Sequence, residues 1–139
     1  IELMIVIAIM AILSAIAIPN FQTYMAQRRL SGAAREVYGN LMAVRMQSIS
    51  ENKRIALNID NNHQYTMLRD NNPNGFFTGE TIGLPKDLHP AYYDVTFSSS
   101  GTVIVFSPNG TGSTGTIGLT GSTGTKSITT SIAGRIKIN

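Results

Sequence analysis

The sequence predicts an α+β fold, in which a long N-terminal α-helix spans a membrane with its first half and packs on an antiparallel β-sheet domain with its second half. Three observations predict it: the first eighteen residues are almost all apolar, a helical period continues to about residue 51, and the period then changes to two. We expect a hydrophobic helix over 1–25, an amphipathic helix over 26–52 and a sheet domain over 53–139. The 139 residues accommodate one such anchor and one small domain.

The apolar run covers residues 1–18, IELMIVIAIMAILSAIAI, and its one carboxylate belongs to Glu2. At about 1.5 Å per residue, a helix of this length covers about 27 Å, which is close to the hydrocarbon thickness of a bilayer. A carboxylate within such a segment costs on the order of a few kcal/mol near the membrane centre. We therefore expect Glu2 to have a cationic partner, on another molecule or at the chain's own amino terminus. The alternatives are a plain single-pass membrane anchor or an uncleaved signal sequence. A signal sequence is disfavoured because no small-residue cleavage site follows the apolar run and the helical pattern continues beyond Phe21.

Pro19 follows the apolar run and predicts a bend or a locally opened helix around residues 15–19, because proline removes a helical N–H and clashes with the preceding turn. Beyond it, two rows of side chains recur at helical spacing. The first row is expected to pack on the sheet and consists of Leu30, Ala34, Val37, Leu41, Val44 and Ser48. The second row either contacts neighbouring subunits or completes the core, and consists of Tyr38, Met42, Arg45, Met46 and Ile49.

Alternation of apolar and polar residues predicts strands over 54–60 and 64–69, joined by a turn at Asn61-Asn62. The Gly/Thr-rich stretch 110–125 is interpreted as short strands joined by small-residue turns. Elsewhere we expect loops over 70–79 and 85–90, a weak strand over 81–84, and strands over 92–97, 102–106, 127–132 and 134–138.

Composition excludes several kinds of chemistry. The chain has no cysteine, which excludes disulfides, thiol catalysis and cysteine metal sites. No glycine-rich nucleotide-binding motif occurs, and His63 and His89 lack any accompanying catalytic signature, so both are interpreted as isolated surface histidines. We predict a protein that is not an enzyme and binds no cofactor.

The segment that begins Asp70-Asn-Asn-Pro-Asn-Gly75 matches the first six positions of a calcium-binding loop. Its twelfth position should be Glu but is Thr81, and Pro73 stiffens the turn. We interpret it as a plain surface turn without a metal.

Residues 1–21, IELMIVIAIMAILSAIAIPNF, resemble the N-terminal segment of type IV pilins and type II secretion pseudopilins. In that family the mature chain opens with a methylated Phe-Thr-Leu directly before Ile-Glu, which implies three residues ahead of Ile1. The back half is similar to minor pseudopilins and minor pilins of the GspH/FimT type, through Phe106-Ser-Pro-Asn-Gly110 and the closing strand Ile132-Ala-Gly-Arg-Ile-Lys-Ile138. No carboxylate side chain follows Asp94, which disfavours the major subunit with its acidic calcium loop.

The resemblance implies a structural subunit of a type II secretion pseudopilus, which polymerises through its N-terminal helix with itself and other pseudopilins to support export of folded proteins across the outer membrane. It implies a single-pass inner-membrane protein with a periplasmic domain before assembly, and a periplasmic or cell-surface filament afterwards. A prepilin peptidase and an inner-membrane assembly platform are the further partners. Glu2 would pair with the amino terminus of the adjacent subunit. The implied assembly residues are Ile1, Glu2, Leu3, Met4, Ile5, Ile7, Pro19 and Phe21.

An alternative is a minor pilin of a type IV pilus, acting in assembly initiation, adhesion or DNA uptake. DNA contact would need a basic cluster, for which Lys126, Arg135 and Lys137 are the candidates. The formal net charge is only +3, and just two pairs of basic residues are adjacent, so nucleic-acid binding is disfavoured. Steeply salt-dependent DNA binding would favour this alternative, and its absence at low salt would remove it.

Overall fold

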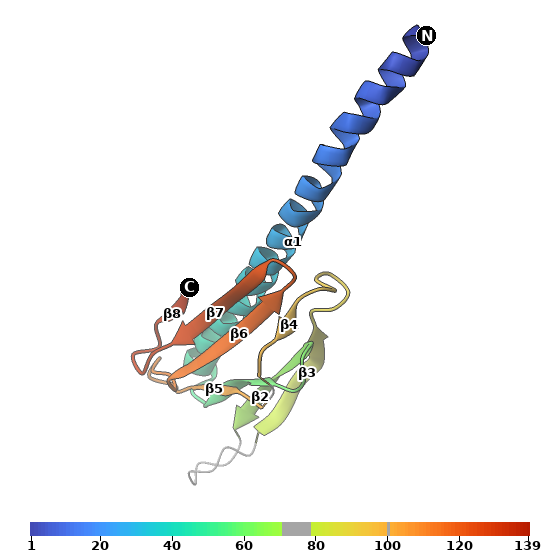
Figure 1. Ribbon diagram of the computed structural model, residues 1–139. Helices are drawn as coiled ribbons and strands as arrows, with labels where there is room; N and C mark the ends of the chain where they lie inside the picture. Colours follow the sequence, from blue (N-terminus) through green and yellow to red (C-terminus); the bar gives the residue numbers. More distant parts are fainter. Residues whose placement is uncertain (71–78, 100) are drawn as a thin grey trace.

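A computed structural model describes residues 1–70, 79–99 and 101–139 and shows a single long helix lying across two small antiparallel sheets (Figure 1). Helix α1 runs over Glu2–Glu51. Its N-terminal half projects away from the sheets, while its C-terminal half packs against them (Figure 1). The expected α+β architecture is confirmed.

The buried face of α1 contains the whole first row that the helical period predicts. Its buried residues are Ala26, Leu30, Ala33, Ala34, Val37, Leu41, Val44 and Ser48. The helix ends at Asn52, whose left-handed backbone (φ 52°) is one that asparagine tolerates at a helix C-terminus. Its N–H donates to the Ile49 carbonyl, so the last turn keeps its hydrogen bonds.

Helix α1 continues through Pro19, and the Thr23 hydroxyl donates to the Pro19 carbonyl at 3.1 Å. The expected bend at Pro19 stays a prediction.

Within the described residues, the sheet domain contains two four-stranded antiparallel sheets, where the sequence analysis expected one sheet. The first has the order β3-β2-β1-β5, and its strands are β1 (Ile55–Ile59), β2 (Gln64–Asp70), β3 (Gly79–Asp87) and β5 (Val103–Phe106). The second has the order β4-β6-β7-β8, and its strands are β4 (Thr96–Phe97), β6 (Gly115–Gly121), β7 (Gly124–Thr130) and β8 (Ile136–Ile138). The predicted hairpin over 54–69 is confirmed as β1 paired with β2.

Two predicted segments were wrong in their secondary structure. Residues 92–97 were expected to form a strand, but only the last two do, because the Tyr92 N–H bonds to the Leu88 carbonyl and the Val95 N–H to the Tyr92 carbonyl, closing a turn. Residues 85–90 were expected to form a loop, but β3 continues to Asp87. Pro85 is tolerated there because β3 is an edge strand, and Gly83 (φ +76°) lets the chain bulge beside it.

The core lies between α1 and the two sheets, and Tyr65 and Phe106 are its largest fully buried side chains. The Tyr65 ring meets Phe97 edge-on at 5.9 Å between centroids. Its hydroxyl accepts a hydrogen bond from the Asn40 amide at 2.7 Å, so the one polar atom of this ring has a partner. Burial, together with the nearby Glu36 carboxylate, raises the pKa of Tyr65.

The calcium-like segment is almost wholly outside the described residues, since its positions 71–75 are not described. Its first residue, Asp70, is buried and pairs with Arg54 at the start of β1.

Candidate assembly surface

The first 25 residues of α1 form an exposed rod, which we call the apolar rod. Every residue in 1–25 is exposed, and Ala26 is the first to be buried against the domain. Among the described residues, α1 is the one helix long and apolar enough to cross a membrane. Because so much apolar surface is unfavourable in water, the rod requires lipid or protein around it.

All eight predicted assembly residues lie on the apolar rod and are exposed. They are Ile1, Glu2, Leu3, Met4, Ile5, Ile7, Pro19 and Phe21. The Ile5 N–H donates to the Ile1 carbonyl, so helical hydrogen bonding starts at the first residue. Glu2 lies in the first turn, where the unpaired N–H groups of a helix favour negative charge. The roles of these residues in subunit contacts stay predictions.

The second row of α1 lies largely outside the core. Met42, Met46 and Ile49 are exposed, with 69% of Met46 accessible, whereas Tyr38 is half-buried against the core cluster. Of the two interpretations that the sequence left open, contact with neighbouring subunits is therefore the one that these three side chains can serve.

An ion pair fastens the helix to the domain where the rod ends. The Arg29 guanidinium donates to both oxygens of the Asp94 carboxylate, at 2.7 and 3.0 Å, and lies 4.6 Å from the centroid of the Tyr93 ring. The Ser122 hydroxyl, in the turn between β6 and β7, also donates to Asp94 at 3.1 Å. The hydrogen bonds from Arg29 lower the pKa of Asp94, and the same contact raises the pKa of Arg29.

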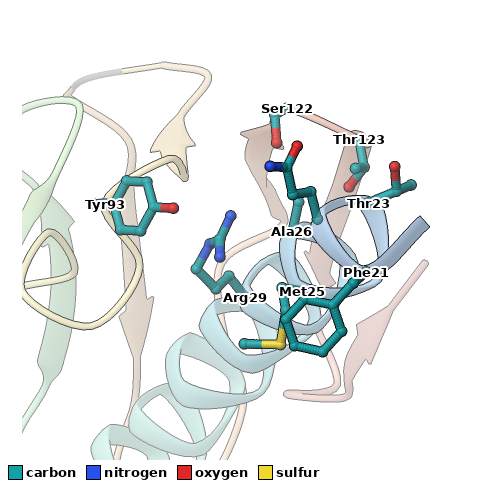
Figure 2. A pocket seen from close by; sticks show the side chains of 9 residues that line it. Phe21, Thr23, Met25, Ala26, Arg29, Tyr93, Ser122 and Thr123 are labelled. Carbon is teal, nitrogen blue, oxygen red and sulfur yellow. The ribbon is translucent and has the colours of Figure 1, made fainter. Parts of the chain in front are cut away.

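A hollow of about 570 Å³ opens beside this ion pair, between the rod and the β6–β7 turn. Figure 2 shows Arg29 reaching from α1 toward Tyr93, with Met25 and Phe21 on the two preceding turns of the helix. The hollow is lined by Phe21, Gln22, Thr23, Met25, Ala26, Arg29, Tyr93, Ser122 and Thr123. Sequence reasoning missed this site because Arg29 and Asp94 are 65 residues apart and no local pattern links them.

A family model for the type II transport protein GspH matches residues 33–134 of the chain. The chain belongs to the GspH family. The match covers the packed half of α1 and nearly all of the sheet domain, and it confirms the resemblance in the back half of the sequence.

Solved structures with the same fold include other pilin-like proteins. The minor pseudopilin EpsH from the type 2 secretion system of Vibrio cholerae superposes with a TM-score of 0.62 and 10% identity, covering 80% of this chain and 96% of EpsH. The type IV minor pilin FimU of Pseudomonas aeruginosa superposes with a TM-score of 0.60 and 18% identity, covering 84% of this chain and 92% of FimU. A second crystal form of FimU gives a TM-score of 0.57 and 20% identity, covering 79% and 92%. These likenesses show the pilin-like fold alone. No curated protein sequence matches the chain.

The three basic residues of the DNA hypothesis do not form one cluster in this GspH-family chain. Arg135 and Lys137 line a common hollow at β8 together with Thr129, on the face opposite to buried Ile128. Lys126 lies instead beside α1, where it lines a hollow with Gln27, Leu30 and Ser31. A role of these residues in DNA contact stays a prediction.

The two histidines of the GspH-family chain lie together, although the sequence analysis treated them as isolated. Their ring centroids are 4.6 Å apart, because the Leu88 N–H bonds to the His63 carbonyl and so brings His89 alongside. His89 is exposed and His63 half-buried. Across the described ranges, no group of three or more His, Cys, Asp or Glu side chains is placed to hold a metal ion.

Proposed function

We propose that this GspH-family chain is a structural subunit of a type II secretion pseudopilus, which polymerises through α1 with itself and with other pseudopilins. The filament supports export of folded proteins across the outer membrane. The observation that carries the proposal is the apolar rod, a fully exposed hydrophobic helix that is continuous with a helix half fixed in a folded domain.

The rod can lie in the membrane or among the rods of other subunits, and assembly moves it from the first environment to the second. Before assembly it spans the inner membrane once, and the sheet domain lies in the periplasm. After assembly it lies among the rods of other subunits, which replace lipid by apolar side chains and favour close packing. We divide the chain accordingly into the membrane and assembly helix 1–25, the domain-bound helix 26–52 and the sheet domain 53–139. A prepilin peptidase prepares and methylates the amino terminus, and a membrane platform inserts the subunit.

Glu2 selects the position of the incoming subunit. In an apolar surrounding, an ammonium and a carboxylate attract strongly, and each offsets the desolvation cost of the other. We assign Glu2 to pairing with the amino terminus of the neighbouring subunit. Leu3, Met4, Ile5 and Ile7 supply the apolar contact around this pair, and Pro19 and Phe21 end the contacting segment.

The test replaces Glu2→Leu and measures filament yield and membrane content in cells that express the complete assembly machinery. We expect an unchanged amount of membrane-inserted subunit and a loss of most filaments, because the rod still enters the bilayer but lacks its ionic partner. The control is Ser14→Leu, which also replaces a polar side chain of the rod with leucine and should leave the yield intact. Wild-type filament yield from Glu2→Leu would refute the role of Glu2.

A type IV minor pilin ranks second. Its support is the fold that this chain shares with FimU, together with the neighbouring Arg135 and Lys137. It ranks below the pseudopilus because the matching family model describes a type II transport protein.

A further inference from the structure

The uninterrupted apolar stretch of the rod ends near residue 20. Residues 1–20 cover about 30 Å as a helix, which equals the hydrocarbon core, and the polar residues Gln22 and Thr23 follow. The next turn of α1, over residues 21–25, therefore lies at the depth of the lipid headgroups once the rod spans a membrane, because these add about 5–7 Å on each side of the hydrocarbon core. The domain reaches the same level, because Ser122 and Thr123 of the β6–β7 turn line one hollow with Phe21 (Figure 2).

Three exposed aromatic side chains lie near this level: Phe21 and Tyr93 line the hollow, and Tyr24 follows Phe21 on α1. The accessible fractions are 63% for Phe21, 50% for Tyr24 and 61% for Tyr93. Tyrosine is enriched where a membrane meets water, because its ring is apolar and its hydroxyl polar. Side chains on a helix tilt toward its N-terminus, so the ring of Tyr24 leans from α1 toward the bilayer.

Arginine side chains lie beside two of these rings. Arg28 Nε donates to the Tyr24 hydroxyl at 2.9 Å, and its guanidinium carbon lies 5.3 Å from the centroid of the Tyr24 ring. Arg29 is neutralised by Asp94, whereas Lys126 lines a second hollow with Gln27. The charge of Arg29 is thus balanced, and the positive charges suited to phosphate groups are those of Arg28 beside Tyr24 and of Lys126.

We infer that the exit collar, formed by Phe21, Tyr24, Arg28, Arg29 and Tyr93, rests on the phospholipid headgroups of the membrane before assembly. The inference rests on the proposed function, because it requires α1 to span a bilayer. It adds a second membrane contact, made by the folded domain, which fixes the depth and the tilt of the subunit. Anionic lipids strengthen this contact through Arg28, since a cation near the bilayer surface is attracted to them.

The test uses a tryptophan reporter in the full chain, which contains no natural tryptophan. The Tyr93→Trp variant is inserted into phosphatidylcholine vesicles with and without phosphatidylglycerol, and lipids brominated near the headgroup serve as quenchers. We expect a blue-shifted emission that the bromolipid quenches, and stronger quenching with phosphatidylglycerol. Adding Arg28→Gln should remove most of that difference between the two lipids, because the cation that faces the headgroups is lost.

Two further variants complete the test. Met46→Trp is the matched control, since Met46 is exposed on the same helix about 38 Å beyond Phe21 and should escape quenching. Leu13→Trp reports insertion of the rod and is read with lipids brominated deep in the acyl chain, because Leu13 would lie near the middle of the bilayer. If Leu13→Trp is quenched but Tyr93→Trp behaves like Met46→Trp, the inference is overturned and the membrane insertion stands. The inference is also overturned if the emission of Tyr93→Trp shifts to the blue only at a high protein-to-lipid ratio and cross-linked dimers form. In that case the collar contacts a second copy of the chain. An unquenched Leu13→Trp contradicts membrane insertion, and both proposals fall.

Discussion

At the scale of single residues, the contact between Arg29 and Asp94 determines how the helix is attached to the domain at the end of the apolar rod. Two hydrogen bonds from one planar guanidinium fix its orientation as well as its distance. Only 14% of the Asp94 side chain is accessible, so water screens the pair less than it would on an open surface.

The attachment should depend on pH through Asp94. Because Arg29 lowers the pKa of the folded carboxyl, the pair contributes its full stability above the unfolded pKa of about 3.9, and this contribution is lost as the pH falls through the lower folded value. We expect Asp94→Asn to lower the Tm at pH 7 and to have little effect in strong acid. Thermal unfolding followed by circular dichroism across this range checks it. A Tm difference that stays constant down to the lowest pH would exclude the ion pair as its cause.

At the scale of elements, α1 presents two different faces along its second half. The side chains of the first row are buried against the sheets, and those of the second row are largely exposed. One helix thereby supplies part of the core of its own domain and leaves an exposed apolar row, which we propose contacts other subunits.

The two faces should respond differently to truncation. Leu41→Ala removes a fully buried side chain and should lower the free energy of unfolding by about 2–5 kcal/mol. Met46→Ala removes an exposed side chain and should change it by less than about 0.5 kcal/mol, while reducing filament assembly. Urea denaturation and filament yield measure the two effects. Equal destabilisation by both substitutions would place the second row in the core, and unchanged assembly in Met46→Ala would remove its role at the surface.

Whether a feature could be predicted from the sequence depends on how far apart in the sequence its interacting residues lie. The first row of α1 and the β1–β2 hairpin were predictable because each depends on a local period. The length of strand β3 was underestimated because nearly all of its residues are exposed, so its sequence lacks the alternation of apolar and polar residues that marks a strand. The contacts between Arg29 and Asp94 and between His63 and His89 join distant segments, and so they required the folded chain.

At the scale of the whole molecule, the chain combines a folded domain that has a buried core with a rod in which every residue is exposed. Its exposed apolar surface is unfavourable in water, and in the proposed function its stable states are the membrane-inserted subunit and the polymer. The GspH-family match covers residues 33–134, so the domain identifies the family and the rod lies beyond the matched part. The proposed assembly role of the rod therefore rests on a segment that the family model does not cover.

The most direct test of this account identifies what surrounds the middle of the rod in assembling cells. A photo-reactive benzoylphenylalanine replaces Leu13, which is exposed in the isolated chain, and the cross-linked products are identified by mass spectrometry. The account predicts adducts with the N-terminal helices of other copies or of related pilin-like subunits, and their loss when Glu2→Leu is added. Adducts with lipid alone, in cells that are producing filaments containing this chain, would contradict it.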